Sequence, residues 1–542
     1  MSNLFRGCVG DTEKLNKEKN YDSDSGDYND PSDIHKPING SHFDLAFKRS
    51  DKVTYKAILP QVLACLSAAS FHLPIGLVVA YSAILLDQLE KPDTEISITK
   101  TEATWVASLT VLIVPGAALL TGVLVDSIGR VSTLKAASIP YVAGWIMIAS
   151  APNITYIMVG RVLTGFALAM GSSPAAVYIT EVARPDLRGA LICLGPTMTS
   201  FGMVLVYLAG CFLHWRTVAW INIGFAILPV LLMYLFTPES PTWLVSKGRN
   251  QEALKACKIV SLDKAKDLLH QRRVKRLERE HERKSITPDP GVLSRFFSSI
   301  GKPTVYKPFF ILSMCFFFQQ FSGIYILIFY AVGFFKDVGS HIDPYLLSVI
   351  VGVERMCVGF ITSQLLYRFG RRILCLTSLF FMAVLMSLSG GCALLVKEKV
   401  LEKNWLLVPI ICLLLYICMS TLGLLSVPWT MTAEMYPLEV RGVMQGFTVC
   451  VAHILMFIAI KSYYWLSEFL GGSHGIQLFF AGVSIVGLIF IYVFLPETHR
   501  KSVEEIENYF VHNTVFIKKR RYHCDDQFPV KNEDDIIGAQ NV

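Results

Sequence analysis

Residues 122–130 read GVLVDSIGR and lie between two apolar runs, and residues 367–372, which read YRFGRR, lie between two others much further along the chain. Two more signals recur in the same order. They are EVARPDLRG at 181–189 with EMYPLEVRG at 434–442, and PESP at 238–241 with PET at 496–498. Three matching signals in one order indicate a duplicated six-helix unit whose two copies pack around a central cavity.

The composition places this duplicated unit in a membrane. Of 542 residues, 53% are hydrophobic and only 17% are charged, and the mean hydropathy is +0.46. Soluble domains carry about 25% charged residues, so most of this chain must face lipid or other buried segments. This excludes a soluble enzyme, a disordered scaffold and a nucleic-acid-binding protein.

Twelve apolar runs have about the length that crosses a bilayer, and in lipid such runs must be helices because each backbone polar group needs an internal partner. The runs are 57–86, 104–125, 132–151, 157–178, 190–212, 218–236, 308–334, 345–366, 373–395, 405–431, 444–466 and 476–495. We therefore predict an all-α membrane protein with twelve transmembrane helices in two six-helix repeats, joined by a cytosolic helical linker.

Loop charges predict the orientation. Basic residues gather on one side of the predicted helices, and the loop 87–102 on the other side is mainly acidic, so the positive-inside rule puts both termini in the cytosol. The expected parts are a disordered cytosolic tail at 1–55, the first half at 56–246, a cytosolic linker with short helices at 247–305, the second half at 306–497 and a cytosolic tail at 498–542.

The repeated charged residues suggest a gate. Asp126 is expected to cap a helix N-terminus, where a carboxylate is attracted by the helix dipole. Other charges are expected to form arginine–carboxylate pairs across the two halves, which would hold the inner gate shut. Those expected to pair across the halves are Glu181, Arg188, Glu434 and Arg441, and Arg130 and Arg371 complete the predicted gating set. The alternative is that they only fix loops and topology.

With these motifs the chain resembles the sugar porter branch of the major facilitator superfamily, from about residue 57 to residue 510. The motifs are GxxxDxxGR at 122–130, Gly160-Arg161, PESPxWL at 238–244, Gln319-Gln320-Phe321-Ser322-Gly323, Pro428-Trp429 with Glu434, and Pro496-Glu497-Thr498. Within the branch, AYSA at 80–83 and LGPT at 194–197 are similar to the insect facilitated trehalose transporters and their relatives.

The resemblance implies a sugar site between the halves. It assigns Gln319 and Gln320 to sugar hydroxyls, because an amide both donates and accepts. It assigns Tyr330 a hydroxyl and a ring face, and Trp429 a stacking contact with the sugar. Ordinary helix packing is the alternative for Trp429.

Two departures from the family's pattern fall in this site. Tyr325 stands where glucose-type relatives carry an asparagine, and Thr421 and Ser426 replace the acid and the proline-rich run of helix 10. We therefore expect a weaker break in helix 10, and a larger or less polar ligand than glucose is an alternative cargo. Tyr325 and Thr421 complete the predicted substrate-binding set.

Energy coupling is predicted to be absent. Proton-coupled sugar porters carry an aspartate in helix 1, but no acid lies between Pro60 and Leu86. We therefore expect facilitated uniport with no cofactor and no metal. Glu354, Arg355 and His453 are charged or titratable groups within membrane runs and are candidates for coupling, so proton symport stays an alternative.

The predicted function is facilitative transport of trehalose or a related sugar by alternating access, not an enzymatic reaction. Two alternatives remain: a sugar sensor that binds without transporting, and a porter for a non-sugar organic solute. The expected partners are a small sugar and the lipid bilayer, without nucleic acid. We expect a monomeric transport unit in the plasma membrane.

Overall fold

A computed structural model describes residues 55–91, 94–184, 187, 191–260, 300–339, 342–437, 440–499, 501, 503–513 and 515–516. In these ranges all regular structure is helical. The predicted N-terminal tail up to residue 54, most of the predicted linker and residues 517–542 lie outside the described part of the chain.

The first half consists of eight helices that form six spans, because two of the spans are bent. The helices are α3 (Tyr55–Ala69), α4 (His72–Leu89), α5 (Lys100–Leu112), α6 (Val114–Ile128), α7 (Arg130–Ala149), α8 (Ile154–Val182), α10 (Leu194–Phe212) and α11 (Trp215–Phe236). The short helices α12 (Pro241–Ser246) and α13 (Asn250–Val260) follow. Helix α13 supports the expectation of short helices in the linker.

The second half repeats this plan with more interruptions. Its helices are α16 (Pro303–Phe321), α17 (Ile324–Phe329), α18 (Ala331–Asp337), α19 (Pro344–Arg368), α20 (Arg371–Lys397), η4 (Lys403–Leu406), α21 (Leu407–Leu422), α22 (Val427–Glu434), α23 (Arg441–Lys461), α24 (Tyr463–Phe469), α25 (Ser473–Phe494) and α26 (Val503–His512). Helix α26 lies in the segment that was predicted as a tail.

The twelve predicted spans are all found as helices. Eleven stretches of the described chain are long and apolar enough to cross a membrane. The remaining expected span, 308–334, is covered by α16, α17 and α18, which are separated at Ser322–Gly323 and at Tyr330. Helix 10 is also interrupted: α21 ends at Leu422 and α22 begins at Val427. The expectation that this break is weaker than in the family's pattern stays a prediction.

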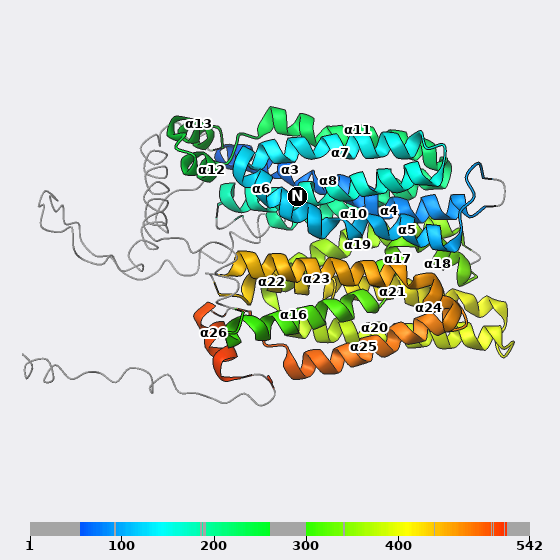
Figure 1. Cartoon of the computed structure of the whole chain (residues 1–542). Helices are drawn as coiled ribbons and strands as arrows, with labels where there is room; N and C mark the ends of the chain where they lie inside the picture. Colours follow the sequence, from blue (N-terminus) through cyan, green and yellow to red (C-terminus); the bar gives the residue numbers. More distant parts are fainter. Residues whose placement is uncertain are drawn as a thin grey trace, which may run out of the picture. The chain divides into compact units, whose positions relative to one another are not determined.

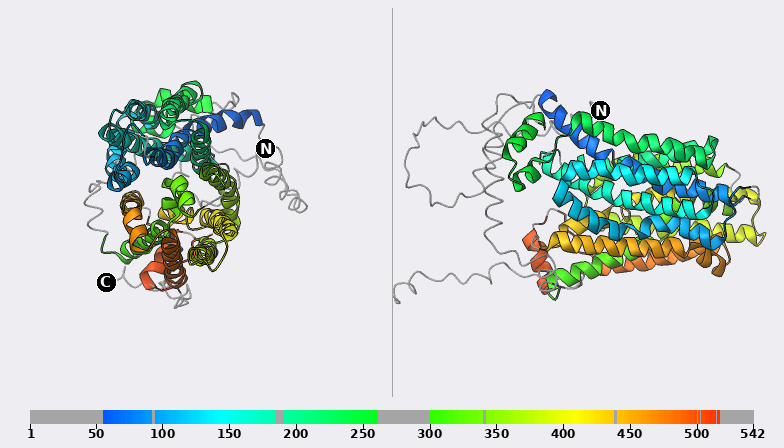
Figure 2. Two further views of the ribbon diagram at one scale, coloured as in Figure 1. Left: turned by 90° about the vertical axis from the view of Figure 1, so that its right-hand side faces the viewer. Right: turned by 45° about the horizontal axis from the view of Figure 1, so that its top comes forward.

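The two sets of six spans form two adjacent groups of helices. Figure 1 shows α3–α11 in blue to green on one side and α16–α25 in green to orange on the other, and the end-on view in Figure 2 agrees. Helix α10 packs against α19, and α5 packs against α23, so these pairs form the interface between the halves.

Candidate functional site

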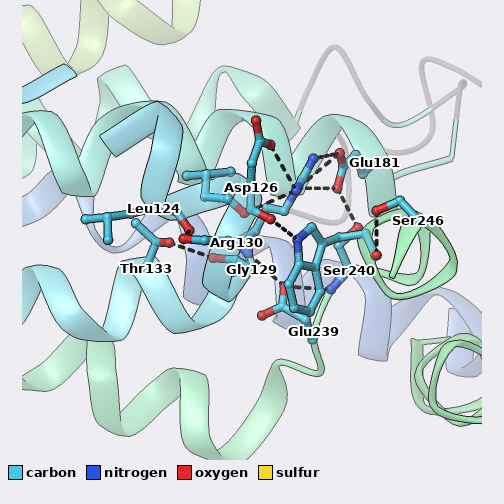
Figure 3. A network of polar contacts seen from close by, with 12 residues as sticks. Leu124, Asp126, Gly129, Arg130, Thr133, Glu181, Glu239, Ser240 and Ser246 are labelled. Carbon is cyan, nitrogen blue, oxygen red and sulfur yellow. Dashed lines mark hydrogen bonds and ion pairs between the residues drawn. The ribbon is translucent and has the colours of Figure 1, made fainter. Parts of the chain in front are cut away.

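A network of charges lies at the end of the first half where α7 begins (Figure 3). The Arg130 guanidinium donates to the carboxylate of Glu181, with Nη2 2.9 Å from Oε1 and Nε 3.1 Å from Oε2. The side chain of Asp126 lies 3.8 Å from Arg130 but is 85% exposed. Glu181 is therefore the close partner of Arg130, and Asp126 is a peripheral one.

Glu239, not Asp126, caps the N-terminus of α7. Its carboxylate accepts hydrogen bonds from the backbone N–H groups of Arg130 at 3.0 Å and Val131 at 3.1 Å. A negative charge at this position satisfies free N–H groups and complements the helix dipole. Gly129 precedes the helix with φ +99°, and a Cβ there would lie 2.5 Å from the Glu239 carboxylate. The predicted capping role of Asp126 is wrong because Asp126 lies in the last turn of α6.

The second half contains the same arrangement. Arg371 Nη2 lies 2.9 Å from Oε1 of Glu434. The Glu497 carboxylate accepts from the backbone N–H of Arg371 at 2.9 Å, and a Cβ on Gly370 would lie only 2.1 Å from it. Thr498 Oγ1 donates to Glu434 over 2.7 Å, as Ser240 Oγ donates to Glu181 in the first half.

Sequence reasoning missed four members of these networks. They are Glu239, Ser240, Glu497 and Thr498. The signal that could have found them was already visible, because PES and PET close the two halves at matching positions. The end of the bundle that contains Arg130 and Arg371 is called the arginine end below; it lies at the left of Figure 1, beside α12 and α26.

The expected pairing across the halves differs from what the structure shows. Arg130 pairs with Glu181 inside the first half, and Arg371 pairs with Glu434 inside the second. Arg441 donates to the backbone carbonyl of Tyr436 at 3.1 and 3.2 Å. Arg188 lies outside the described residues. Each arginine is close to the acid of its own half because one repeat unit brings both to neighbouring helix ends.

Contacts between the halves gather at the opposite end, which contains Tyr345, Tyr463 and Tyr464 and is called the tyrosine end. Asp87 of α4, whose side chain is only 5% exposed, accepts a hydrogen bond from the Tyr345 hydroxyl over 2.7 Å and lies 3.4 Å from the ammonium group of Lys336. Both partners belong to the second half. These contacts fasten the halves together at this end.

Two more contacts reinforce the tyrosine end. The Tyr464 hydroxyl donates to the Glu90 carboxylate, and Lys461 Nζ donates to Thr104 Oγ1 over 2.8 Å. Partial desolvation raises the pKa of Glu90, the hydrogen bond from Tyr464 lowers it, and the nearby carboxylate of Asp87 raises it. Glu90 therefore takes up a proton more readily than an ordinary glutamate does.

The predicted glutamine pair is fully buried, but its two members differ. Gln319 Nε2 donates to the backbone carbonyls of Leu424 at 2.6 Å and Leu425 at 3.1 Å, both in the break between α21 and α22. Gln320 Nε2 donates to Gln319 Oε1 over 3.2 Å, and Gln320 Oε1 has no partner among the described residues. Gln319 thus stabilises the break in helix 10, and Gln320 keeps a free acceptor.

Two hydroxyl groups that were predicted to bind sugar already donate hydrogen bonds to backbone carbonyls of the protein. Tyr330 donates to the carbonyl of Ile460 over 3.2 Å and stacks on Tyr463 with ring centroids 4.6 Å apart. Thr421 Oγ1 donates to the carbonyl of Ile417, one turn earlier, over 2.9 Å. In this conformation Tyr330 and Thr421 hold helices in place, and a role in sugar binding stays a prediction.

Trp429 lies among aromatic rings at the junction of three helices. Its ring centroid is 4.8 Å from that of Phe316 and 5.7 Å from that of His453, both in edge contact. The imidazole Nδ1 of His453 lies 2.8 Å from the carbonyl oxygen of Val449. Tyr325 hydrogen-bonds to the Trp429 indole. Trp429 and Tyr325 therefore lie together, as the predicted sugar site requires.

The adjacent charges in α19 do not pair with each other. Within the described residues no ion pair joins Glu354 to Arg355. Glu354 hydrogen-bonds to Cys418 of α21, and Arg355 lies near Tyr207 and Tyr325. Successive helical residues are about 100° apart around the axis, so the two charges point to different neighbours.

Comparison with known protein families identifies the family to which the chain belongs. The family model described as "Sugar (and other) transporter" matches residues 61–510. The chain belongs to this sugar transporter family. Its members are transporters, and this one is accordingly a membrane transport protein and not an enzyme.

Named relatives and solved structures agree with that assignment. This sugar transporter is 32% identical over 450 residues to the "Facilitated trehalose transporter Tret1-2 homolog" of Drosophila sechellia, covering 82% of this chain and 90% of the relative. It is 31% identical to the "Facilitated trehalose transporter Tret1" of Aedes aegypti, covering 83% of this chain but 55% of that longer relative.

The fold matches solved structures of the major facilitator superfamily. The inward open conformation of the xylose transporter XylE from E. coli superposes with a TM-score of 0.66 at 20% identity, covering 82% of this chain and 98% of that one. The partially occluded inward open form of the same transporter gives a TM-score of 0.65 at 18% identity. The expected fold class is confirmed.

Proposed function

We propose that this chain is a facilitative carrier of trehalose or a related sugar and works by alternating access. The arginine end and both termini lie in the cytosol, and the protein acts in the plasma membrane as a single-chain transport unit. The halves at 56–246 and 306–497 move against each other, and the segment at 247–305 joins them on the cytosolic side.

One observation carries this proposal: the halves are fastened to each other at the tyrosine end, whereas the arginine networks pair inside each half. Asp87 bonds to Tyr345 across the halves, and Arg130 and Arg371 bond to acids of their own halves. A carrier needs each end to open in turn. The contacts fit a conformation that is closed toward the outside, and the arginine networks keep each half rigid while it moves.

The sugar would bind beside Gln320, Tyr325 and Trp429. Gln320 offers a buried acceptor without a partner, and Trp429 offers a partly exposed ring next to Tyr325. Gln319 would act by holding the helix break that positions this region. Transport is uniport rather than proton symport.

Uptake into proteoliposomes tests the proposal. We expect saturable uptake of labelled trehalose that stops at equal concentrations on both sides and is lost when Trp429 is replaced by alanine. A pH-sensitive dye inside the vesicles should show no proton movement with the sugar. Binding of trehalose without flux would identify a sensor, and flux of organic solutes that sugars do not inhibit would identify another cargo.

A further inference from the structure

The guanidinium group of Arg355 lacks the partners that a buried arginine needs. Arg355 lies in the middle of α19, a membrane span that packs against α10 of the other half. Its Nε and Nη1 atoms are enclosed and make no hydrogen bond with any described residue. Leaving such a charge unpaired inside a membrane protein is costly, so an intramembrane arginine of this kind indicates a functional site.

Arg161 shows how this chain satisfies an arginine that only supports the fold. Arg161 is fully buried. Its Nε donates to the carbonyl of Val106 at 3.0 Å, its Nη1 to the carbonyl of Val78 at 2.9 Å, and its Nη2 to the hydroxyl of Ser82. All three nitrogens of Arg161 have acceptors. The contrast indicates that the missing acceptors of Arg355 are supplied by something other than the fold.

Among the described residues no acid forms an ion pair with Arg355. Glu354 hydrogen-bonds to Cys418 instead. The electrostatic neighbours of Arg355 are the phenols of Tyr325 and Tyr207, which are neutral at physiological pH, and the carboxyl group of the adjacent Glu354. The Tyr207 hydroxyl is already used, because it donates to the carbonyl of Ile328 over 2.8 Å.

The position of Arg355 coincides with the proposed sugar site. Tyr207 belongs to the first half and Tyr325 to the second, so Arg355 lies where the two halves meet. Tyr325 connects Arg355 to Trp429 through its own hydrogen bond with the indole. Gln320, which is fully buried in the span that leads to Tyr325, has an amide oxygen that lacks a donor.

We propose that Arg355 binds the acidic group of a sugar-derived anion, so that the carrier accepts a sugar acid or a sugar phosphate in addition to neutral sugars. An arginine fork matches a carboxylate or a phosphate with two parallel hydrogen bonds. A hydroxyl of the same ligand donates to the free oxygen of Gln320. This inference rests on the proposed sugar site and names the charge of its ligand.

Matched ligands test this charge requirement in the purified full-length protein. Glucose, glucuronate and glucose 6-phosphate share a ring and differ in the group on the last carbon. We expect glucuronate or glucose 6-phosphate to bind at least about tenfold more tightly than glucose. A preference for glucuronate identifies a carboxylate as the group bound, and a preference for glucose 6-phosphate identifies a phosphate.

Two variants of one residue locate the effect. R355Q should lower the affinity for the preferred anion about ten- to hundredfold, and R355K, which keeps the positive charge but loses the paired hydrogen bonds of the guanidinium, should retain only part of the anion preference. Equal binding of the anion by R355Q and the original protein would overturn the proposal. Inhibition of glucose uptake by the anion in the unmodified protein gives the same test without any variant, and no inhibition would also overturn it.

The outcome separates this inference from the proposed function. Transport of neutral sugars without any binding of the anions contradicts only the role of Arg355. Failure to bind or move any of the three ligands, or trehalose, contradicts the sugar-carrier function itself and the inference with it.

Discussion

The hydroxyl of Tyr345 donates a 2.7 Å hydrogen bond to the carboxylate of Asp87, and the two residues belong to opposite halves of the transporter. The Asp87 side chain is almost fully buried, so this bond is shielded from water. Hydrogen bonds to buried charges stabilise more than those on the surface. The pair is therefore a main element of the closed tyrosine end.

Replacing Tyr345 by phenylalanine should open this end more often. The change removes one hydrogen bond to a charged acceptor, which we expect to shift the equilibrium roughly tenfold toward the open form. Spin labels at Lys91 and Trp465, two exposed positions on opposite halves, report the opening as a longer distance. An unchanged distance distribution in Tyr345→Phe would show that this bond does not hold the end closed.

The raised pKa of Glu90 predicts that acid favours the closed tyrosine end. Partial desolvation is the largest cause of the shift, and we expect it to lessen when the end opens. The closed form therefore binds the proton more tightly and gains population as pH falls through the raised pKa, and it loses this advantage at higher pH.

The same spin-label distance, followed from about pH 8 to about pH 4.5, around and above the ordinary pKa of a glutamate, checks this. Glu90→Gln should remove most of the pH dependence, because the residue then carries no titrating group. Glu95→Gln, which removes an exposed acid that pairs with Arg216 inside the first half, is the matched control and should keep it. A pH response that survives in Glu90→Gln would assign it to another group.

The helix-capping carboxylates should matter for stability. Glu497→Gln removes the negative charge at the start of α20 and should cost about 1 kcal/mol, as should Glu239→Gln at the start of α7. Thermal unfolding in detergent gives the comparison. Glu252→Gln, which breaks an exposed pair with Arg249, serves as the control and should leave Tm unchanged. Equal Tm values for all three variants would contradict the capping role.

Replacing Gln319 and replacing Gln320 by alanine should have different effects on stability and on sugar binding. Gln319→Ala leaves the carbonyls of Leu424 and Leu425 without their donor, at a cost of about 1–3 kcal/mol for each buried group. Gln320→Ala removes an acceptor that is free in the protein alone. Gln319→Ala should lower Tm clearly, whereas Gln320→Ala should mainly weaken sugar binding. The reverse pattern would overturn these assignments.

The fold was predictable from the sequence because lipid allows few alternatives. Apolar runs such as 132–151 must be helices, and the repeated signals at 122–130 and 367–372 reveal the two halves. The break in helix 10 receives a hydrogen bond from Gln319, which is more than a hundred residues away in the sequence. Composition near Thr421 and Ser426 could not show this distant donor.

The sequence predicted which residue types form the site, but it did not predict which of them pair with each other. Sequence reasoning selected Arg130 and Glu181, yet it expected pairs across the halves. Which acid an arginine meets depends on how the helices pack and on the conformation, and neither is encoded in spacing alone. The hydroxyl of Thr421 shows the same limit, because a helical threonine often bonds to the carbonyl one turn earlier.

Chemical cross-linking of the tyrosine end tests alternating access most directly. Asp87→Cys and Tyr345→Cys, joined by a short bifunctional maleimide in proteoliposomes, should fix the halves together at the end where they already touch. We predict that cross-linking stops the exchange of labelled trehalose across the membrane. Each variant that carries only one of these two substitutions should continue to exchange after the same treatment. Undiminished exchange in the cross-linked protein would contradict a carrier that must open this end in every cycle.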